Sequence, residues 1–240
     1  MLLFVTKAFY SISSCSITEM DVQVTPPQGR IEIITGCMFS GKTEELIHRA
    51  QRSEIAGEHI VGFKPQIDDR YEKSAICSHT GVNVDAIPVG NGSEGTERVL
   101  QSISNHEERV KEDQGSERPE DLIEFEVEKE DIDVIVIDEV NLFEGALVDM
   151  VRELAEKDYR IILSGLDLTF RSEPFDPVPN LLALADHVEK RQAVCEECGD
   201  PATRTQRLID GEPAPYDAPT IDVGGKNKYE PRCRNCHKIN

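Results

Sequence analysis

The chain has 240 residues, enough for one large domain or for a domain with a smaller one attached. It carries 46 Asp and Glu against 26 Lys and Arg, so its formal net charge is −20. This charge argues against a general nucleic-acid binder and against a protein that binds anionic membranes, because both need a basic surface. The composition is typical of a protein that stays soluble in concentrated salt, although an acidic protein from an ordinary cell is the alternative.

The first 28 residues do not resemble the start of a folded domain. Residues 1–10 are apolar with one lysine, and residues 11–16 follow without a clear cleavage site. A signal peptide and a true start of translation at Met20 are both alternatives, and we expect residues 1–28 to be an N-terminal extension that is disordered or that contains a misassigned start. No apolar run approaches the roughly 18 residues of a membrane span. We therefore expect a cytoplasmic protein.

From residue 29 the chain alternates between short apolar runs and amphipathic segments. This alternation predicts an α/β fold with a parallel sheet that is covered by helices on both faces. Gly57 stands where the first helix should end. The expected elements are a strand over 31–35, a loop over 36–42, a helix over 43–56, strands over 59–63 and 134–137, a helix over 143–157 and a strand over 160–164.

Two stretches depart from this alternation. Residues 90–131 are rich in glycine and acidic residues, so we expect a partly disordered surface insertion, in which Val99, Leu100 and Ile103 make one amphipathic helix. From Glu189 onward, short strands, prolines and cysteine pairs replace the longer elements. We therefore predict a main domain over 29–188, with an acidic insertion over 91–130, and a small domain over 189–240.

The strongest motif is a complete G-x-x-x-x-G-K-[ST] sequence between the first strand and the first helix. It reads Gly36-Cys37-Met38-Phe39-Ser40-Gly41-Lys42-Thr43. The backbone N–H groups of such a phosphate loop bind the β-phosphate of ATP, the lysine reaches the β- and γ-phosphates, and the threonine hydroxyl binds Mg²⁺. An ordinary glycine turn is the alternative, but the strand before the loop and the helix after it favour a nucleotide site.

Two carboxylates follow the buried strand over 134–137. Asp138 and Glu139 stand at its C-terminal end, where open α/β sheets bind their ligands. Asp138 is suited to bind Mg²⁺ through water, and Glu139 is suited to accept a proton from an attacking hydroxyl or water. A solvated strand end is the alternative, and the phosphate loop weighs against it.

Four of the seven cysteines form two C-x-x-C pairs. Pairs of this kind can close a tetrahedral zinc site, and four sulfur ligands leave no open position, so we predict one structural Zn²⁺ per chain. Two accidental pairs of free thiols are the alternative. The predicted ligands are Cys195, Cys198, Cys233 and Cys236.

Together these motifs resemble the thymidine kinases of the zinc-containing type, which occur in bacteria, archaea and the animal cytosol. The resemblance spans roughly residues 29–237, and the acidic composition is similar to that of a halophilic archaeal member. The matching segments are the phosphate loop, residues 63–71, 78–79, 137–139 and 165–175, the two cysteine pairs, and residues 223–225 with Tyr229. The resemblance implies a RecA-like core, a small zinc domain whose lasso loop closes over thymidine, a homotetramer, and feedback inhibition by thymidine triphosphate.

The resemblance also implies roles for single residues. Glu139 is the general base for the 5′-hydroxyl of thymidine, Arg70 neutralises charge on the transferred group, and Asp68 joins Thr43 and Asp138 at Mg²⁺. Other positions match the thymidine pocket of the family. The substrate-binding residues expected in this way are Leu142, Leu166, Phe170, Phe175, Thr205, Asp222, Val223, Gly224 and Tyr229.

Three positions depart from the family pattern. Asn141 and Leu142 stand where the family usually has Gln and Phe, and Asp222 stands where it tends to have an aliphatic residue. These departures bear on the choice between thymine and uracil. Our hypothesis is a kinase that transfers the γ-phosphoryl group of ATP to thymidine. The alternatives are an ATPase, a kinase of another nucleoside, and a non-catalytic nucleotide-sensing zinc module.

Overall fold

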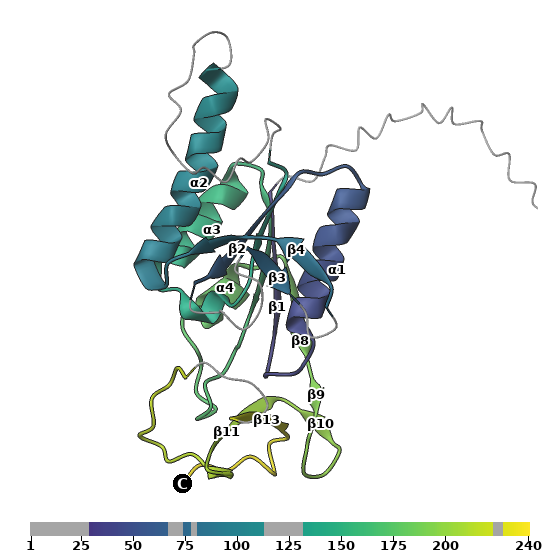
Figure 1. Cartoon of the computed structure of the whole chain (residues 1–240), viewed down its shortest axis with the longest axis vertical. Helices are drawn as coiled ribbons and strands as arrows, with labels where there is room; N and C mark the ends of the chain where they lie inside the picture. Colours follow the sequence, from purple (N-terminus) through teal and green to yellow (C-terminus); the bar gives the residue numbers. More distant parts are fainter. Residues whose placement is uncertain (1–28, 67–73, 78–80, 113–131, 223–227) are drawn as a thin grey trace, which may run out of the picture.

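The computed structural model describes residues 29–66, 74–77, 81–112, 132–222 and 228–240. Its main domain is built on a six-stranded sheet in the order β5-β2-β6-β7-β1-β8 (Figure 1). All neighbouring strands of this sheet run parallel, which confirms the expected sheet. The strands are β1 (Arg30–Gly36), β2 (Ile60–Pro65), β5 (Ile87–Val89), β6 (Val134–Ile137), β7 (Arg160–Gly165) and β8 (His187–Arg191).

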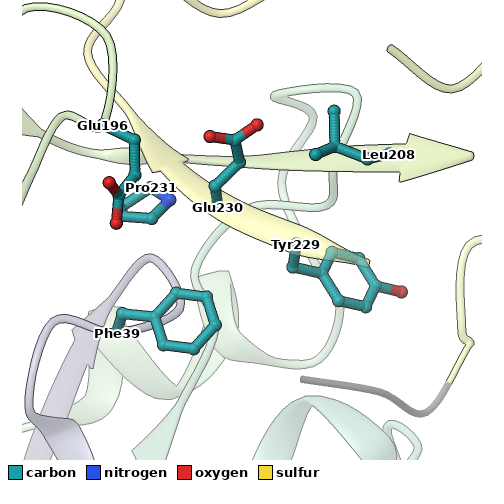
Figure 2. Close-up of a pocket in the computed structure, with 6 residues that line it drawn as sticks. All are labelled: Phe39, Glu196, Leu208, Tyr229, Glu230 and Pro231. Carbon is teal, nitrogen blue, oxygen red and sulfur yellow. The ribbon is translucent and has the colours of Figure 1, made fainter. Parts of the chain in front are cut away.

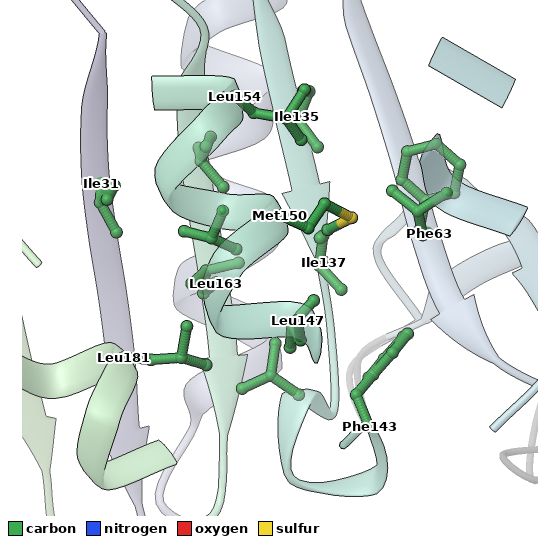
Figure 3. Packing of buried hydrophobic residues seen from close by; sticks show 14 of the residues in the cluster. Ile31, Phe63, Ile135, Ile137, Phe143, Leu147, Met150, Leu154, Leu163 and Leu181 are labelled. Carbon is green, nitrogen blue, oxygen red and sulfur yellow. The ribbon is translucent and has the colours of Figure 1, made fainter. Parts of the chain in front are cut away.

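Helices cover both faces of the sheet, because successive side chains of each strand point to opposite faces. Ile34 of β1 and Val136 of β6 pack under helix α1 (Lys42–Ile55), whereas Ile33 and Ile137 lie in a second, larger cluster with the other helices. Figure 3 shows part of this larger cluster, including Ile137. A hairpin of two short strands adds to the α1 side. These elements are α1 (Lys42–Ile55), α2 (Gly92–Glu112), α3 (Ala146–Glu156), α4 (Val178–Leu184), β3 (Ala75–Cys77) and β4 (Asn83–Asp85).

Helix α2 corrects the expectation for residues 90–131. The amphipathic helix around Val99, Leu100 and Ile103 is confirmed, but Val99 and Ile103 are buried in the larger cluster. The start of this stretch is therefore a covering layer of the main domain rather than a surface insertion, while residues 113–131 lie outside the described residues. The extension expected over residues 1–28 also lies outside them.

The small C-terminal domain lies beyond the C-terminal ends of the parallel strands (Figure 1). Its strands pair antiparallel. Because β8 is still part of the main sheet, the chain leaves that sheet after Arg191, slightly later than the predicted boundary at Glu189. The small domain contains β9 (Ala193–Val194), β10 (Pro201–Ala202), β11 (Arg204–Ile209), β12 (Glu212–Pro213) and β13 (Tyr229–Arg232). In the part of the chain that the structure describes, no helix is long and apolar enough to cross a bilayer.

Candidate functional site

The phosphate loop connects β1 to α1, as the motif predicts. Gly36 has a φ of 143° and Gly41 a φ of 78°, which are values that favour glycine. A Cβ atom at Gly36 would lie 2.4 Å from the carbonyl oxygen of Arg191, so the neighbouring strand leaves no room for a side chain. The loop ends at the N-terminus of α1, where backbone N–H groups and the helix dipole favour an anion.

Lys42 is folded into this loop. Its Nζ atom donates to the carbonyl oxygen of Cys37 at 3.0 Å, and the Ser40 hydroxyl donates to the same oxygen at 2.8 Å. The lysine is largely buried, so its charge is held within the loop rather than in solvent. A phosphate bound by the loop would therefore meet a cation that is already in place.

Asp138 lies beside the start of α1. Its carboxylate accepts hydrogen bonds from the hydroxyl of Thr43 at 3.2 Å, from the backbone N–H of Glu139 at 2.9 Å and from the hydroxyl of Ser164. The structure thus brings together the two described residues that we expect at Mg²⁺, Thr43 and Asp138. Ser164 was missed by sequence reasoning, and its only signal was a polar residue near the end of an otherwise apolar strand.

Glu139 turns the chain sharply after β6. Its φ of 50° and ψ of 44° are left-handed values, which are uncommon for a residue other than glycine. Such backbone strain costs about 1–3 kcal/mol and is found most often at functional sites. Glu139 is partly exposed, and it precedes the short 3₁₀ helix Val140–Leu142. Glu139 therefore follows β6 at the same edge of the sheet at which the phosphate loop follows β1.

Asn141 joins two loops of the site. It is buried, and its Oδ1 atom accepts a hydrogen bond from the backbone N–H of Leu166 at 2.8 Å. The side-chain amide of Asn141 therefore holds the segment after β7 against the segment after β6. Leu142, Leu166 and Phe175 are each partly exposed near these segments.

The phosphate loop also contacts the small domain. The thiol of Cys37 donates to the carbonyl oxygen of Ala202 at 3.3 Å, and the N–H of Met38 donates to the hydroxyl of Thr205 at 3.1 Å. Burial raises the pKa of the Cys37 thiol, so it stays neutral. The next residue, Phe39, faces a pocket of about 310 Å³ (Figure 2). The pocket is lined by Phe39, Glu196, Leu208, Tyr229, Glu230 and Pro231.

Phe170 lies between two arginines. The guanidinium carbons of Arg171 and Arg207 are 4.5 and 5.5 Å from its ring centre, and the ring is buried against Ala214 and Ala218. Arg171 donates to the backbone oxygens of Tyr216 and Ala218. Phe170 therefore belongs to a small core that fixes the segment over 214–220 to the segment that follows β7.

Asp222 holds the end of this segment through two cations. Its carboxylate accepts from Arg207 at 2.9 Å and from Lys228 at 2.8 Å, and its carbonyl oxygen accepts from the Tyr229 hydroxyl at 2.7 Å. Lys228 is the main cause that lowers the pKa of Asp222, and Arg207 adds to the effect. The acidic residue that departs from the family pattern is thus paired within the small domain.

The two cysteine pairs converge. The sulfur atoms of all four predicted zinc ligands lie within 4.8 Å of one another, and those of Cys198 and Cys233 are 3.7 Å apart. A tetrahedral site with Zn–S bonds of about 2.3 Å separates its sulfurs by about 3.8 Å, so the cluster fits Zn²⁺. His237, which directly follows Cys236, contacts a different group, since its Nε2 lies 2.8 Å from the carbonyl oxygen of Phe170.

The remaining predicted site residues cannot be placed. Asp68, Arg70, Val223 and Gly224 lie outside the described residues, so their roles stay predictions. Thr205 and Tyr229 are described and buried, Thr205 against the phosphate loop and Tyr229 beside Asp222.

Comparisons with known proteins agree with the motifs. The family model described as "Thymidine kinase" matches residues 29–110 and 89–237. A thymidine kinase from Haloquadratum walsbyi is 46% identical over 215 residues, which are 87% of this chain and 95% of that protein.

Proposed function

Because the chain belongs to the thymidine kinase family, we propose that it transfers the γ-phosphoryl group of ATP to the 5′-hydroxyl of thymidine. The observation that carries this proposal is one edge of the parallel sheet. There the phosphate loop and Thr43 follow β1, and Asp138 and the strained Glu139 follow β6. Thr43 and Asp138 are joined by a hydrogen bond. A nucleotide loop, a metal-binding pair and a base are the parts that phosphoryl transfer to an alcohol requires.

The loop N–H groups and Lys42 hold the triphosphate in this proposal. Thr43 and Asp138 would hold Mg²⁺, which neutralises charge on the β- and γ-phosphates when it is bound. The Ser164 hydroxyl fixes the orientation of the Asp138 carboxylate. Glu139 accepts the proton of the 5′-hydroxyl, because a primary alcohol attacks poorly while it keeps its proton.

The small domain supplies the nucleoside side of the site in this proposal. The contacts of Cys37 and Met38 with the small domain bring the phosphate loop against β10 and β11. Zinc would hold the base of that domain through four thiolates, which makes it structural rather than catalytic. We also carry over from the family a homotetramer, a cytoplasmic location and inhibition by thymidine triphosphate, all of which stay predictions.

A nucleoside panel tests the function. The purified protein is incubated with ATP, Mg²⁺ and either thymidine, deoxyuridine or deoxycytidine, at salt from low to molar KCl. We expect thymidine monophosphate as the main product. A rate of ATP hydrolysis that does not change when thymidine is added would instead identify an ATPase. Phosphorylation of deoxycytidine alone would identify another nucleoside kinase, and nucleotide binding without turnover would identify a nucleotide sensor.

A further inference from the structure

A buried acid on β1, next to the edge strand β8, starts a chain of ion pairs. Glu32 of β1 is only 2% exposed, and its carboxylate accepts from Arg49 of α1 and from Arg160 of β7, each at 2.8 Å. Burial alone would raise the pKa of Glu32, but the two arginines and Arg30 lower it below its ordinary value. Glu32 therefore stays ionised and joins the helix to the sheet.

The chain of ion pairs continues towards the phosphate loop. Arg49 also pairs with Glu45 at 3.0 Å and with Glu189 of β8 at 2.5 Å. The second oxygens of these two carboxylates both accept from one nitrogen of Arg191, at 3.3 and 2.7 Å. Glu45 and Glu189 thus each bridge the two arginines, with one carboxylate oxygen on Arg49 and the other on Arg191.

Arg191 ends this network on the phosphate loop itself. Its Nε atom donates to the carbonyl oxygen of Ser40 at 3.1 Å. Its guanidinium group lies 3.5 Å from the position that a Cβ of Gly41 would take, and its own carbonyl oxygen blocks a side chain at Gly36. One residue of the edge strand therefore touches the loop at both of its glycines and at the serine between them.

We propose that Arg191 is a positioning residue for nucleotide binding, because it fixes the outer face of the phosphate loop. When the Ser40 carbonyl oxygen accepts its hydrogen bond from Arg191, on the outside of the loop, the backbone N–H groups of the residues after Ser40 can point towards the bound phosphates. An arginine suits this role, since its planar fork can join a carbonyl oxygen and two carboxylates at once, which a lysine does poorly. This inference rests on the proposed function only in that the loop binds ATP.

Three variants test the proposal by binding rather than by turnover. R191L removes the hydrogen bond to the Ser40 carbonyl, and R191K keeps the positive charge but loses the planar guanidinium group. R160L is the control, because it removes an arginine from the opposite end of the same ion-pair network. For each variant, the affinity for a fluorescent N-methylanthraniloyl ATP and the Tm are measured without nucleoside. The KM for ATP, the KM for thymidine and kcat are then compared.

Loss of one charge-assisted hydrogen bond should weaken ATP binding by roughly fivefold to tenfold in R191L. We expect R191K to recover part of this loss, with the KM for thymidine and kcat within about twofold of the wild type. R160L should lower the Tm but leave ATP affinity within about twofold, because Arg160 pairs with Glu32, Ser53 and Glu58 rather than with the loop.

The outcomes separate this inference from the proposed function. If R191L and R191K bind ATP as tightly as the wild type, or if R160L weakens binding as much as R191L, the positioning role is overturned. If R191L does not fold, weaker binding by R191K still supports the role. A wild type that binds the ATP analogue but does not phosphorylate thymidine overturns the function and leaves the inference standing, whereas a wild type that does not bind the analogue overturns both.

Discussion

Replacing Ser164 by alanine removes one hydroxyl from the carboxylate of Asp138. Ser164 is fully buried, so no water is expected to take its place, and Asp138 keeps its bonds to Thr43 and to the N–H of Glu139. A hydrogen bond to a charged group is worth about 1.5–3 kcal/mol, which corresponds to about 10- to 150-fold in a rate or binding constant. Because the bonds from the Thr43 hydroxyl and from the N–H of Glu139 remain, we expect a loss near the lower end, about tenfold in kcat/KM for ATP.

The assay is a Mg²⁺ titration of thymidine phosphorylation by S164A at fixed ATP. The S164A enzyme should need more Mg²⁺ to reach half its maximal rate, because its Asp138 carboxylate is less well oriented. Ser53→Ala is the matched control, since Ser53 is also buried and accepts a hydrogen bond from Arg160 far from the site. Unchanged kinetics in S164A, or an equal loss in S53A, would refute the orientation of Asp138 by Ser164.

Two further predictions concern zinc and pH. If the four cysteines hold Zn²⁺ as predicted, removal of the ion with a chelator should weaken ATP binding as well as lower the Tm, because Cys37 of the phosphate loop lies in one buried cluster with the predicted ligands Cys195 and Cys233. Metal-free protein with unchanged ATP affinity would contradict this coupling. Glu32→Gln should lower the Tm at neutral pH and flatten the fall in Tm in acid. The folded protein lowers the pKa of Glu32, so the contribution of Glu32 to stability is complete above its ordinary pKa near 4.5 and is lost as the pH falls through its pKa in the folded protein. Parallel curves of Tm against pH for the variant and the wild type would show that the ion pairs do not stabilise the fold.

The elements that could be predicted are those with local causes. The phosphate loop needs glycine at two positions for backbone reasons, and the strand before Asp138 is continuously apolar because it is buried on both faces. The cysteine pairs were predicted for a similar reason, since a four-sulfur zinc site needs cysteines, and C-x-x-C is a short local spacing that brings two thiolates together. All three were found where the sequence placed them.

The contacts that were missed depend on tertiary packing. Nothing in the sequence says that Arg191 of the edge strand reaches Ser40, or that Ser164 of β7 faces Asp138 at the end of the neighbouring strand β6. The burial of helix α2 against the sheet was missed because its acidic residues outnumber the apolar ones, although the spacing of Val99 and Ile103 marked its buried face. Asp222 departs from the family pattern, and only the structure pairs it with cations.

The most direct test of the account is Glu139→Gln, assayed for turnover with ATP and thymidine and for binding of the ATP analogue. The variant keeps the shape of the side chain but cannot accept the proton of the hydroxyl. We predict that turnover falls by about 10²- to 10⁴-fold while ATP affinity stays within about twofold of the wild type. Turnover close to that of the wild type would remove Glu139 from the chemistry and contradict the proposed mechanism.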